Sequence, residues 1–462
     1  MDSDPYSYET ESVCPVCLKK ISARRVTENG ETRIIKKCIE HGEFSTPVWR
    51  GEPAIQNWAR PKTPSVPPVT DTTALKGCPF DCGLCPEHNQ HTCTALVEIT
   101  WRCDLNCKIC FASAGNVENH SVKSSKNKIL PRPDPTVDEL KILLAKVRET
   151  AGPCNLQLSG GEPAVRDDLP QLATIAKELG FPFVQINTNG LRIARQKELA
   201  KIWADAGVDS VFLQFDGTRD DIYESIRGRS LLKEKMCAIT NLIEAGIGVV
   251  LVPTIVPGVN DDNIGEILKL AVEHAPGVRG VHFQPVSYFG RYPQSPSDKA
   301  RITLPEIMTK LEEQTSSLVH KTDFLPPACE HALCSFHSNY MVMENGNLKK
   351  LSGKGEACCS TRPAAEGAEK SKSFVRRQWA APVVSECCCT KPLDDLDRFI
   401  QRAKTHILAV SGMAFQDAWT LDLERLKGCC IHVAAPDGKL IPFCAYNLTS
   451  MEGSSLYRGK ND

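Results

Sequence analysis

The stretch HTCTALVEITWRCDLNCKIC (91–110) joins a candidate β-strand to a group of three cysteines. The apolar segment ALVEIT (95–100) is followed directly by a C-x3-C-x2-C spacing, formed by Cys103, Cys107 and Cys110. Three thiols at this spacing can hold three irons of a four-iron cluster and leave the fourth iron open to another molecule. In a barrel of parallel strands, the loop after a strand lies at the active-site mouth. The stretch therefore predicts a catalytic cluster.

A second triplet of the same spacing lies just upstream, at Cys78, Cys82 and Cys85. Cys93 follows eight residues later, so we expect this upstream cluster to gain its fourth ligand locally. After the 103–110 triplet, the chain has no cysteine until position 154, inside another candidate strand. We therefore predict that the downstream triplet is open and catalytic, and that the upstream one holds a closed auxiliary cluster.

Composition limits the class of protein. The chain has 462 residues, 41% apolar and 24% charged, which is typical of a soluble globular protein. A net charge of −1 offers no strong attraction for nucleic acid. The sequence shows no apolar run long enough to span a membrane and no signal-peptide pattern, so we expect a cytoplasmic protein. Under that expectation, 22 cysteines at short spacings indicate metal ligation rather than disulfides.

Strand-like and helix-like segments alternate between residues 95 and 320. Capping-box patterns at Thr136/Glu139 and Thr303/Glu306 mark two helix starts. Such alternation predicts an α/β fold with a parallel sheet, here a partial (β/α)6 barrel. The expected strands are 95–100, 154–158, 182–187, 210–215, 248–254 and 279–285.

The remaining segments surround this barrel. We expect a metal module at 1–50, a linker with the auxiliary cluster segment at 51–94, the barrel at 95–320, and a C-terminal auxiliary-cluster region at 321–462 that includes a surface insertion at 353–392. The metal module carries a C-x2-C-x20-C-x2-H pattern made of Cys14, Cys17, Cys38 and His41. Four ligands without an open position predict a structural mononuclear site, either zinc or a rubredoxin-like iron.

Motifs at the expected strand ends resemble the radical S-adenosylmethionine (SAM) superfamily. They are LSGGEP (158–163), INTNG (186–190), QFDG (214–217), VPTIVPGVN (252–260) and FQPV (283–286). The resemblance implies that a reduced cluster cleaves SAM to a 5′-deoxyadenosyl radical, which removes hydrogen from an unactivated C–H bond. It also implies a set of SAM-contacting residues: Gly160, Gly161, Glu162, Asn187, Asn189, Asp216, Arg227 and Gln284. The two glycines would let the backbone approach the SAM amino group.

The C-terminal region carries further cysteines in CEHALC and near the chain end. We expect Cys329, Cys334, Cys444 and either Cys429 or Cys430 to hold a second auxiliary cluster, with Cys429 favoured by the resemblance. Three histidines could substitute as ligands: His331, His337 and His432. The predicted cofactors are thus three [4Fe–4S] clusters, SAM and one mononuclear iron or zinc. The other cysteines are expected to be non-ligands: Cys154 and Cys237 at buried apolar positions, and Cys358, Cys359 and Cys387–Cys389 in the insertion.

The order of all these motifs is similar to that in the archaeal tetraether lipid synthase and its relatives. This resemblance implies C–C bond formation between the ends of lipid tails. One relative is described as a methyltransferase that acts on a dihydropterin, which gives a second interpretation. A third is a non-catalytic redox or cluster-transfer protein. A lipid substrate predicts an apolar cavity mouth, whereas a small heterocycle predicts a few convergent polar groups. Either enzyme needs an electron donor such as ferredoxin or flavodoxin.

Overall fold

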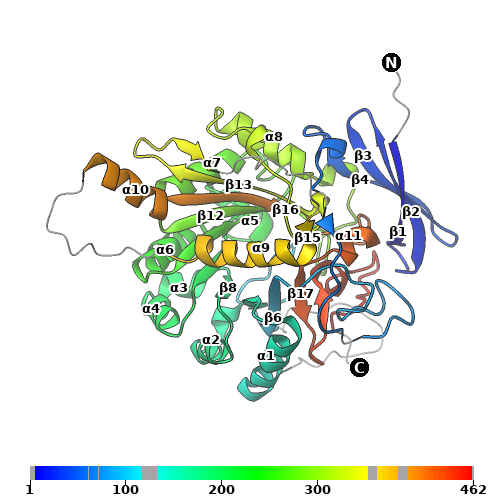
Figure 1. The fold of residues 1–462 in the computed structure, drawn as a ribbon, viewed down its shortest axis with the longest axis horizontal. Coiled ribbons are helices and arrows are strands. Elements are labelled where there is room, and N and C mark those ends of the chain that lie inside the picture. Colours follow the sequence, from blue (N-terminus) through cyan, green and yellow to red (C-terminus); the bar gives the residue numbers. More distant parts are fainter. Residues whose placement is uncertain are drawn as a thin grey trace.

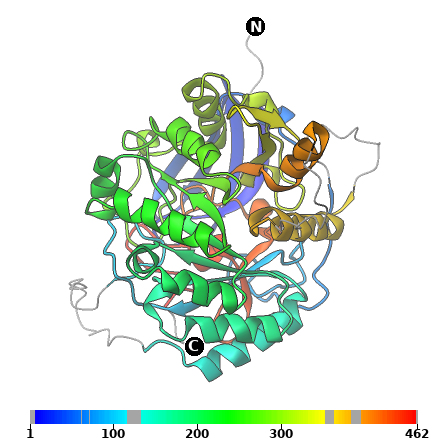
Figure 2. The ribbon, with the colours of Figure 1, turned by 90° about the vertical axis from the view of Figure 1, so that its left-hand side faces the viewer.

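A computed structural model describes residues 6–60, 62–70, 72–115, 133–351, 362–382 and 394–459. These residues form a small N-terminal sheet beside one large curved sheet with helices around it (Figures 1 and 2). The cysteines expected to be non-ligands in the insertion, Cys358, Cys359 and Cys387–Cys389, lie outside the described residues. None of the described helices has the length and apolar character that crossing a bilayer requires.

Six parallel strands form the centre of the large sheet and confirm the predicted partial barrel. Their order across the sheet is also their order along the chain, as successive right-handed crossovers produce. The strands are β6 (Thr94–Thr100), β7 (Asn155–Gly160), β8 (Val184–Thr188), β9 (Ser210–Gln214), β10 (Gly248–Val252) and β12 (Val278–Pro285), with β11 (Thr254–Ile255) paired to β12.

The C-terminal region extends this same sheet at both edges. Next to β12 lie β16 (Ile407–Met413), β13 (Ser335–Val342) and β14 (Leu348–Lys350). Next to β6 lie β17 (Ile431–Ala434) and β18 (Leu440–Pro442). Because β17 pairs in parallel with β6, residues near the chain end lie against the strand that leads into the cysteine loop.

Helices cover the outer face of the barrel strands (Figure 2). Both predicted capping boxes are present, at the first residues of α1 and α8. Inward-facing leucine, isoleucine and valine side chains of helices and strands form one continuous core. The helices are α1 (Val137–Ala151), α2 (Leu169–Glu178), α3 (Leu191–Arg195), α4 (Glu198–Asp205), α5 (Asp220–Arg227), α6 (Leu232–Glu244), α7 (Ile264–Glu273) and α8 (Leu304–Gln314).

Short elements complete the connections. The C-terminal helices are α10 (Asp395–Thr405), α11 (Leu423–Lys427) and α12 (Phe443–Tyr446). Single 3-10 turns occur at η1 (Ile55–Asn57), η3 (Pro163–Val165), η4 (Asp298–Ala300), η5 (Lys321–Asp323) and η6 (Ala332–Cys334). Two two-residue strands, β5 (Lys62–Thr63) and β15 (Arg362–Pro363), pair in parallel.

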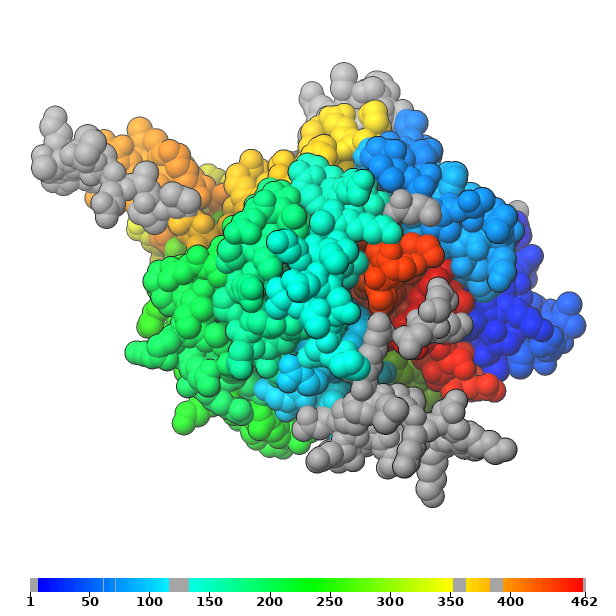
Figure 3. All heavy atoms as spheres, turned by 90° about the horizontal axis from the view of Figure 1, so that it is seen from below, coloured from blue at the N-terminus to red at the C-terminus, as the bar shows by residue number. Residues whose placement is uncertain are grey.

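The N-terminal module is a four-stranded antiparallel sheet at one end of the molecule. It consists of β1 (Tyr6–Val13), β2 (Lys20–Glu28), β3 (Glu31–Cys38) and β4 (Gly42–Arg50). Strand β1 packs on α11, and Ser12 Oγ donates to the carbonyl of Leu421. Figure 3 shows the module beside residues of the C-terminal end. The module therefore contacts the C-terminal region directly.

The expected surface insertion at 353–392 is corrected by helix α9 (Ala364–Trp379). This helix packs one face on β10, β12 and β16 and leaves the other face exposed. Small residues permit the close approach, because a Cβ on Gly367 would lie 2.4 Å from the carbonyl oxygen of Ala328. A Cβ on Gly248 would likewise lie 2.0 Å from the carbonyl oxygen of Trp379. The composition of residues 353–392 gave no sign of this helix, which covers part of the barrel.

The two cysteines expected at buried apolar positions differ. Cys154 is buried, as predicted, just before β7. Cys237 is exposed on α6, so that prediction was wrong. The helix buries the face that carries Ala238 and Leu242, and the neighbouring position points outward.

Candidate active site and cysteine groups

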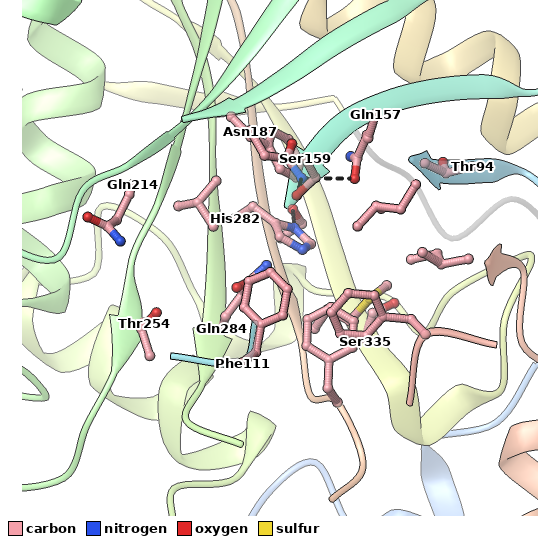
Figure 4. A pocket seen from close by; sticks show the side chains of 18 of the residues that line it. Thr94, Phe111, Gln157, Ser159, Asn187, Gln214, Thr254, His282, Gln284 and Ser335 are labelled. Carbon is pink, nitrogen blue, oxygen red and sulfur yellow. Dashed lines mark hydrogen bonds between the residues drawn. The ribbon is translucent and has the colours of Figure 1, made fainter. Parts of the chain in front are cut away.

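A cavity of about 590 Å³ occupies the inside of the barrel. Its walls come from the inner faces of the strands, from the cysteine loop after β6 and from α9. Figure 4 shows side chains from several strands pointing into this space. Cys103, Cys107 and Cys110 all line it, so the predicted catalytic triplet faces the barrel interior.

The segment after β12 holds the cysteine loop in place. Arg291 donates from Nε to the carbonyl of Cys107 at 2.8 Å and from a terminal nitrogen to the carbonyl of Ala114 at 2.9 Å. The backbones of Cys110 and Arg291 also exchange two hydrogen bonds. Burial raises the pKa of the Cys103 and Cys107 thiols, so both stay protonated until a metal supplies positive charge.

A buried ion pair braces the same loop from the β9 side. Arg227 forms two hydrogen bonds with Asp216, each 2.7 Å long. Burial alone would lower the pKa of Arg227, but the Asp216 carboxylate raises it well above its usual range. Arg227 lines the cavity near Cys107, whose pKa it lowers against the effect of burial. Asp216 is fully buried behind it and does not line the cavity.

Gly160 and Gly161 pack against the start of the cysteine loop. A Cβ on Gly160, whose φ is +121°, would lie 2.2 Å from the carbonyl oxygen of Thr100. A Cβ on Gly161 would lie 2.1 Å from that of Arg102. Both glycines also line the cavity. The physical requirement for glycine here is thus a backbone-to-backbone contact that sets the loop position, in addition to the predicted approach of SAM.

Glu162 connects the loop after β7 to the loop after β8 and, through Asn189, to the cysteine loop. One of its oxygens accepts from Ala164 N and Thr188 Oγ1, and the other accepts from Asn189 N at 2.6 Å. Burial raises the pKa of Glu162 to about 7, although these hydrogen bonds oppose the change. Asn189 in turn donates to Asp104 in the cysteine loop at 2.7 Å. The carboxylate of Glu162 therefore has an internal structural role.

Polar side chains alternate along the inner faces of the buried strands, and the sequence analysis missed most of them. The signal was present as polar residues at every second position of otherwise apolar strands. Figure 4 shows several of these side chains, with Asn187 beside Gln157 and Ser159. They are Asn155, Gln157, Ser159, Asn187, Gln214, Thr254, His282 and Gln284.

Several cavity-lining residues carry buried polar atoms for which the described residues offer no hydrogen-bond partner, and three of these atoms matter here. Asn155 accepts from Arg376 through Oδ1 but leaves Nδ2 unpaired. Asn187 donates through Nδ2 and leaves Oδ1 unpaired. The indole nitrogen of Trp379 is also unpaired. A buried polar atom without a partner costs about 1–3 kcal/mol, so these atoms favour a polar occupant.

Aromatic side chains lie in two groups around the cavity. The rings of Phe212, His282 and Trp379 form a triangle, with centroids 5.6 Å apart for Phe212 and His282, 4.8 Å for Phe212 and Trp379, and 6.2 Å for His282 and Trp379. A second group near the cysteine loop centres on Phe443, which contacts Phe111, Phe289 and Phe415. The cavity therefore combines polar edges with flat apolar surfaces.

The structure brings together most of the residues predicted to contact SAM. Seven line the one cavity, and Asp216 lies behind the wall. The seven are Gly160, Gly161, Glu162, Asn187, Asn189, Arg227 and Gln284.

The four predicted ligands of the N-terminal module also converge. Their sulfur and nitrogen atoms all lie within 4.8 Å of one another, as a single ion requires. His41 Nδ1 lies 3.6 Å from Cys14 Sγ and 3.5 Å from Cys38 Sγ. The hydrogen bond from His41 lowers the pKa of Cys38 to about 6, whereas burial raises that of Cys14 to about 11. None of the four lines the barrel cavity, which fits a structural site.

The predicted grouping of the auxiliary cysteines is corrected. Cys93 lies with Cys329 and Cys430, all three sulfurs within 4.8 Å, instead of closing the upstream triplet. Cys329 therefore lies with Cys430, whereas Cys429, the favoured ligand, lies near Cys334 and Cys444, as expected. Spacing along the chain suggested local closure, but the pairing of β17 with β6 brings Cys430 to Cys93.

The other auxiliary cysteines form two more groups. Cys78, Cys82 and Cys85 line a small hollow beside α11. The backbone N–H of Cys82 donates to Tyr457 Oη at 3.0 Å, which fixes this group against the C-terminal segment. The second group consists of Cys334, Cys429 and Cys444. Burial raises the pKa of the Cys429 thiol, and the neighbouring thiols Cys444 and Cys334 raise it further.

Comparisons with known proteins agree with this geometry. The family model of the radical SAM superfamily matches residues 97–271, and that of the HMPTM N-terminal zinc ribbon domain matches residues 6–50. The chain is 34% identical, over 95% of its length and 93% of the relative's, to 7,8-dihydro-6-hydroxymethylpterin dimethyltransferase of Methanocaldococcus jannaschii.

More distant matches cover parts of the chain. Molybdenum cofactor biosynthesis protein 1 of Bos taurus is 25% identical over 71% of this chain and 50% of that protein. The SAM-bound crystal structure of Streptococcus suis SuiB shares 16% identity, with a TM-score of 0.38, over 50% of this chain and 49% of that one. The chain is a radical SAM enzyme and belongs to the family of the 7,8-dihydro-6-hydroxymethylpterin dimethyltransferase.

Proposed function

We propose that this enzyme is a C-methyltransferase whose acceptor is a pterin-like heterocycle. The observation that carries the proposal is the set of unpaired polar atoms on the cavity wall, at Asn155, Asn187 and Trp379. The relative at 34% identity is named for methylation of a dihydropterin. Its name and the cavity chemistry thus support the same class of substrate.

The edge of an aminopyrimidinone ring offers hydrogen-bond partners of the kinds that these atoms lack. Such a ring presents N–H donors and a carbonyl acceptor side by side, and Asn187 Oδ1 can accept while Asn155 Nδ2 and Trp379 Nε1 can donate. Phe212 and Trp379 offer flat surfaces on which a planar ring can stack. A lipid tail would leave all three atoms unpaired. Coupling of lipid tails, which the motif order put first, therefore receives less support.

The chemistry of the reaction belongs to the bound groups. Together, a [4Fe–4S] cluster and SAM supply an organic radical that can remove hydrogen from an unactivated carbon. Cys103, Cys107 and Cys110 would hold the cluster. The braces at Arg227 and Arg291 keep the loop carrying these thiols in one position. The aromatic group around Phe443 would help to exclude water at the loop.

Other predicted components remain part of this proposal. Six of the seven cavity residues expected to contact SAM would do so, and the seventh, Asn187, would contact the pterin instead. The N-terminal module would hold zinc, in agreement with its match to a zinc ribbon family. The auxiliary thiols would hold further clusters, with electrons delivered by ferredoxin or flavodoxin in the cytoplasm. These assignments follow the donor chemistry of the residues present.

The test is an anaerobic assay of the reconstituted enzyme with SAM, a reductant and 6-hydroxymethyl-7,8-dihydropterin. We expect a methylated pterin, detected by mass spectrometry. Asn187→Leu should raise KM for the pterin by about 10-fold or more, because one polar contact to a substrate is worth about 1–3 kcal/mol. The exposed Asn57→Leu is the matched control.

Two results would count against the proposal. The first is no methylation of any pterin under conditions in which SAM is cleaved. The second is transfer of deuterium from the terminal carbon of a labelled lipid tail into 5′-deoxyadenosine, which would restore the lipid interpretation.

A further inference from the structure

A histidine and a serine on adjacent strands face the cavity side by side. His282 of β12 is paired in register with Ser411 of β16, and both residues line the cavity. Nδ1 of His282 lies 2.8 Å from the hydroxyl oxygen of Ser411. Figure 4 shows the imidazole of His282 among the side chains that point into the cavity. Neither residue belongs to the cysteine loop or to the set expected to contact SAM.

The second ring nitrogen of His282 is available to an occupant of the cavity. Nε2 makes no hydrogen bond within the described chain, although the side chain is only 7% exposed. Burial lowers the pKa of His282 to about 4, so the imidazole is neutral at pH 7. A neutral imidazole offers one N–H donor and one nitrogen acceptor. At this position it is therefore a hydrogen-bonding group rather than an acid or a base.

Ser411 determines what Nε2 can do. A hydroxyl can donate or accept, so it is compatible with either tautomer of the imidazole. When the hydroxyl donates to Nδ1, the proton of His282 is on Nε2, which then donates into the cavity. When Nδ1–H donates to the hydroxyl, Nε2 accepts instead. The pair can thus bind a ring N–H group or an unprotonated ring nitrogen, while Ser411 holds the imidazole in one orientation.

The pair lies on a different part of the barrel wall from Asn155 and Asn187. Strands β10 and β9 separate β12 from β8 in the sheet. Trp379 connects the two parts, because its indole nitrogen is unpaired and its ring centroid lies 6.2 Å from that of His282. Phe212 stacks on His282 at 5.6 Å and adds a flat apolar surface. A planar ring held at Trp379 therefore lies beside His282.

We propose that His282 binds a nitrogen of the fused second ring of a bicyclic acceptor, with Ser411 as its positioning residue. The inference rests on the proposed pterin-like acceptor and narrows it. Asn155, Asn187 and Trp379 would bind the aminopyrimidinone edge, and His282 would bind the other polar edge. A buried Nε2 without a partner is unfavourable, so the site selects nitrogen over carbon in the fused ring.

Two matched ligands test this selection. Pterin and 2-aminoquinazolin-4-one share the aminopyrimidinone edge, but the second has carbon in place of both nitrogens of the fused ring. Equilibrium dialysis against the reconstituted holoenzyme with SAM, without a reductant, measures binding in the absence of turnover. We expect pterin to bind about 10-fold more tightly or better, because the analogue leaves Nε2 unpaired. Equal affinities would overturn the proposal.

Variants of His282 test whether this residue causes the preference. His282→Phe keeps a planar ring without nitrogens, so pterin affinity should fall by about 10-fold while the affinity for the quinazolinone stays the same. His282→Gln, whose amide can donate and accept, should recover part of the pterin affinity. The control is His320→Phe at an exposed histidine, which should change neither affinity. Equal losses for both ligands in His282→Phe would indicate a structural role and contradict the proposal.

Ser411→Ala tests the positioning residue. Nε2 remains in place, but the imidazole loses the hydroxyl that orients it. We expect a smaller loss of affinity, about 3-fold and for pterin alone, because one neutral hydrogen bond is removed behind the contact. Unchanged pterin affinity in Ser411→Ala would exclude Ser411 from the role.

Asn187→Leu separates this inference from the proposed function. The variant should weaken the binding of both ligands, because Asn187 acts on the edge that they share. If wild-type enzyme binds neither ligand, the pterin-like acceptor is wrong and the inference fails with it. If wild type binds both equally and Asn187→Leu weakens both, the acceptor stands and only the role of His282 and Ser411 is wrong.

Discussion

The catalytic loop and the thiol group at the other end of the barrel each bring three cysteines together, by different routes. In the loop, Cys103, Cys107 and Cys110 lie within eight residues of sequence, and one loop conformation is enough to group them. At the far end, the three thiols belong to segments around 93, 329 and 430, and only the folded sheet joins them. Short spacing thus predicts a site that forms locally, whereas a site assembled across a sheet requires the topology.

The largest expected effect separates the two groups by function. Changing Cys103, Cys107 and Cys110 to Ala should abolish SAM cleavage, because no other thiols face that end of the barrel in the described chain. Changing Cys93, Cys329 and Cys430 to Ala should leave cleavage to 5′-deoxyadenosine detectable while removing a comparable share of the metal. Chromatography of 5′-deoxyadenosine, with iron, zinc and sulfide counts, measures both.

A third set of variants tests whether the catalytic cluster has been assigned to the correct triplet. Changing Cys78, Cys82 and Cys85 to Ala should also spare SAM cleavage. If that set alone abolished cleavage while the 103/107/110 set retained it, the assignment of the catalytic cluster would be wrong.

The next effect concerns the brace of the catalytic loop. Arg227→Met leaves the Asp216 carboxylate buried without its partner, which costs about 3–5 kcal/mol. We expect a lower midpoint of urea unfolding and a loss of SAM cleavage, because the loop beside Cys107 loses its support. Arg301→Met breaks a comparable buried pair with Asp417, away from the cavity. This control should reduce stability while sparing SAM cleavage in the folded fraction.

A pH effect of similar size belongs to Glu162. Burial raises its pKa from 4.5 to about 7, so the folded protein favours the protonated acid. The stabilisation is complete below pH 4.5 and is lost as the pH rises through 7, a change of about 3 kcal/mol. Unfolding of wild type and Glu162→Gln between pH 5 and 8 should show a steeper decline for wild type. Parallel curves would show that Glu162 does not titrate in this range.

The sequence predicted the barrel well because its strands carry a strong local signal. Six apolar segments alternate with amphipathic helices, and two capping boxes start helices where expected. Helix α9 was missed because its Ala, Lys, Ser and Glu content resembles a surface segment, and only its packing against the large sheet shows that one of its faces is buried. The partners of Cys93 were missed for the same reason, because β-sheet pairing between residues 93 and 430 leaves no short-range pattern.

The smallest expected effect concerns the glycine that the catalytic loop packs against. A Cβ on Gly161 would lie 2.1 Å from the backbone oxygen of Arg102, so Gly161→Ala must push the loop away. Overpacking of this kind costs about 1–3 kcal/mol, and the displaced thiols should lower the rate of SAM cleavage. Gly428→Ala is the control. This glycine also lies next to cysteines, Cys429 and Cys430, but a Cβ on it would have no neighbour closer than 3.7 Å. A normal cleavage rate in Gly161→Ala would show that the loop tolerates a shift, and that its position depends on Arg227 and Arg291 rather than on the contact with β7.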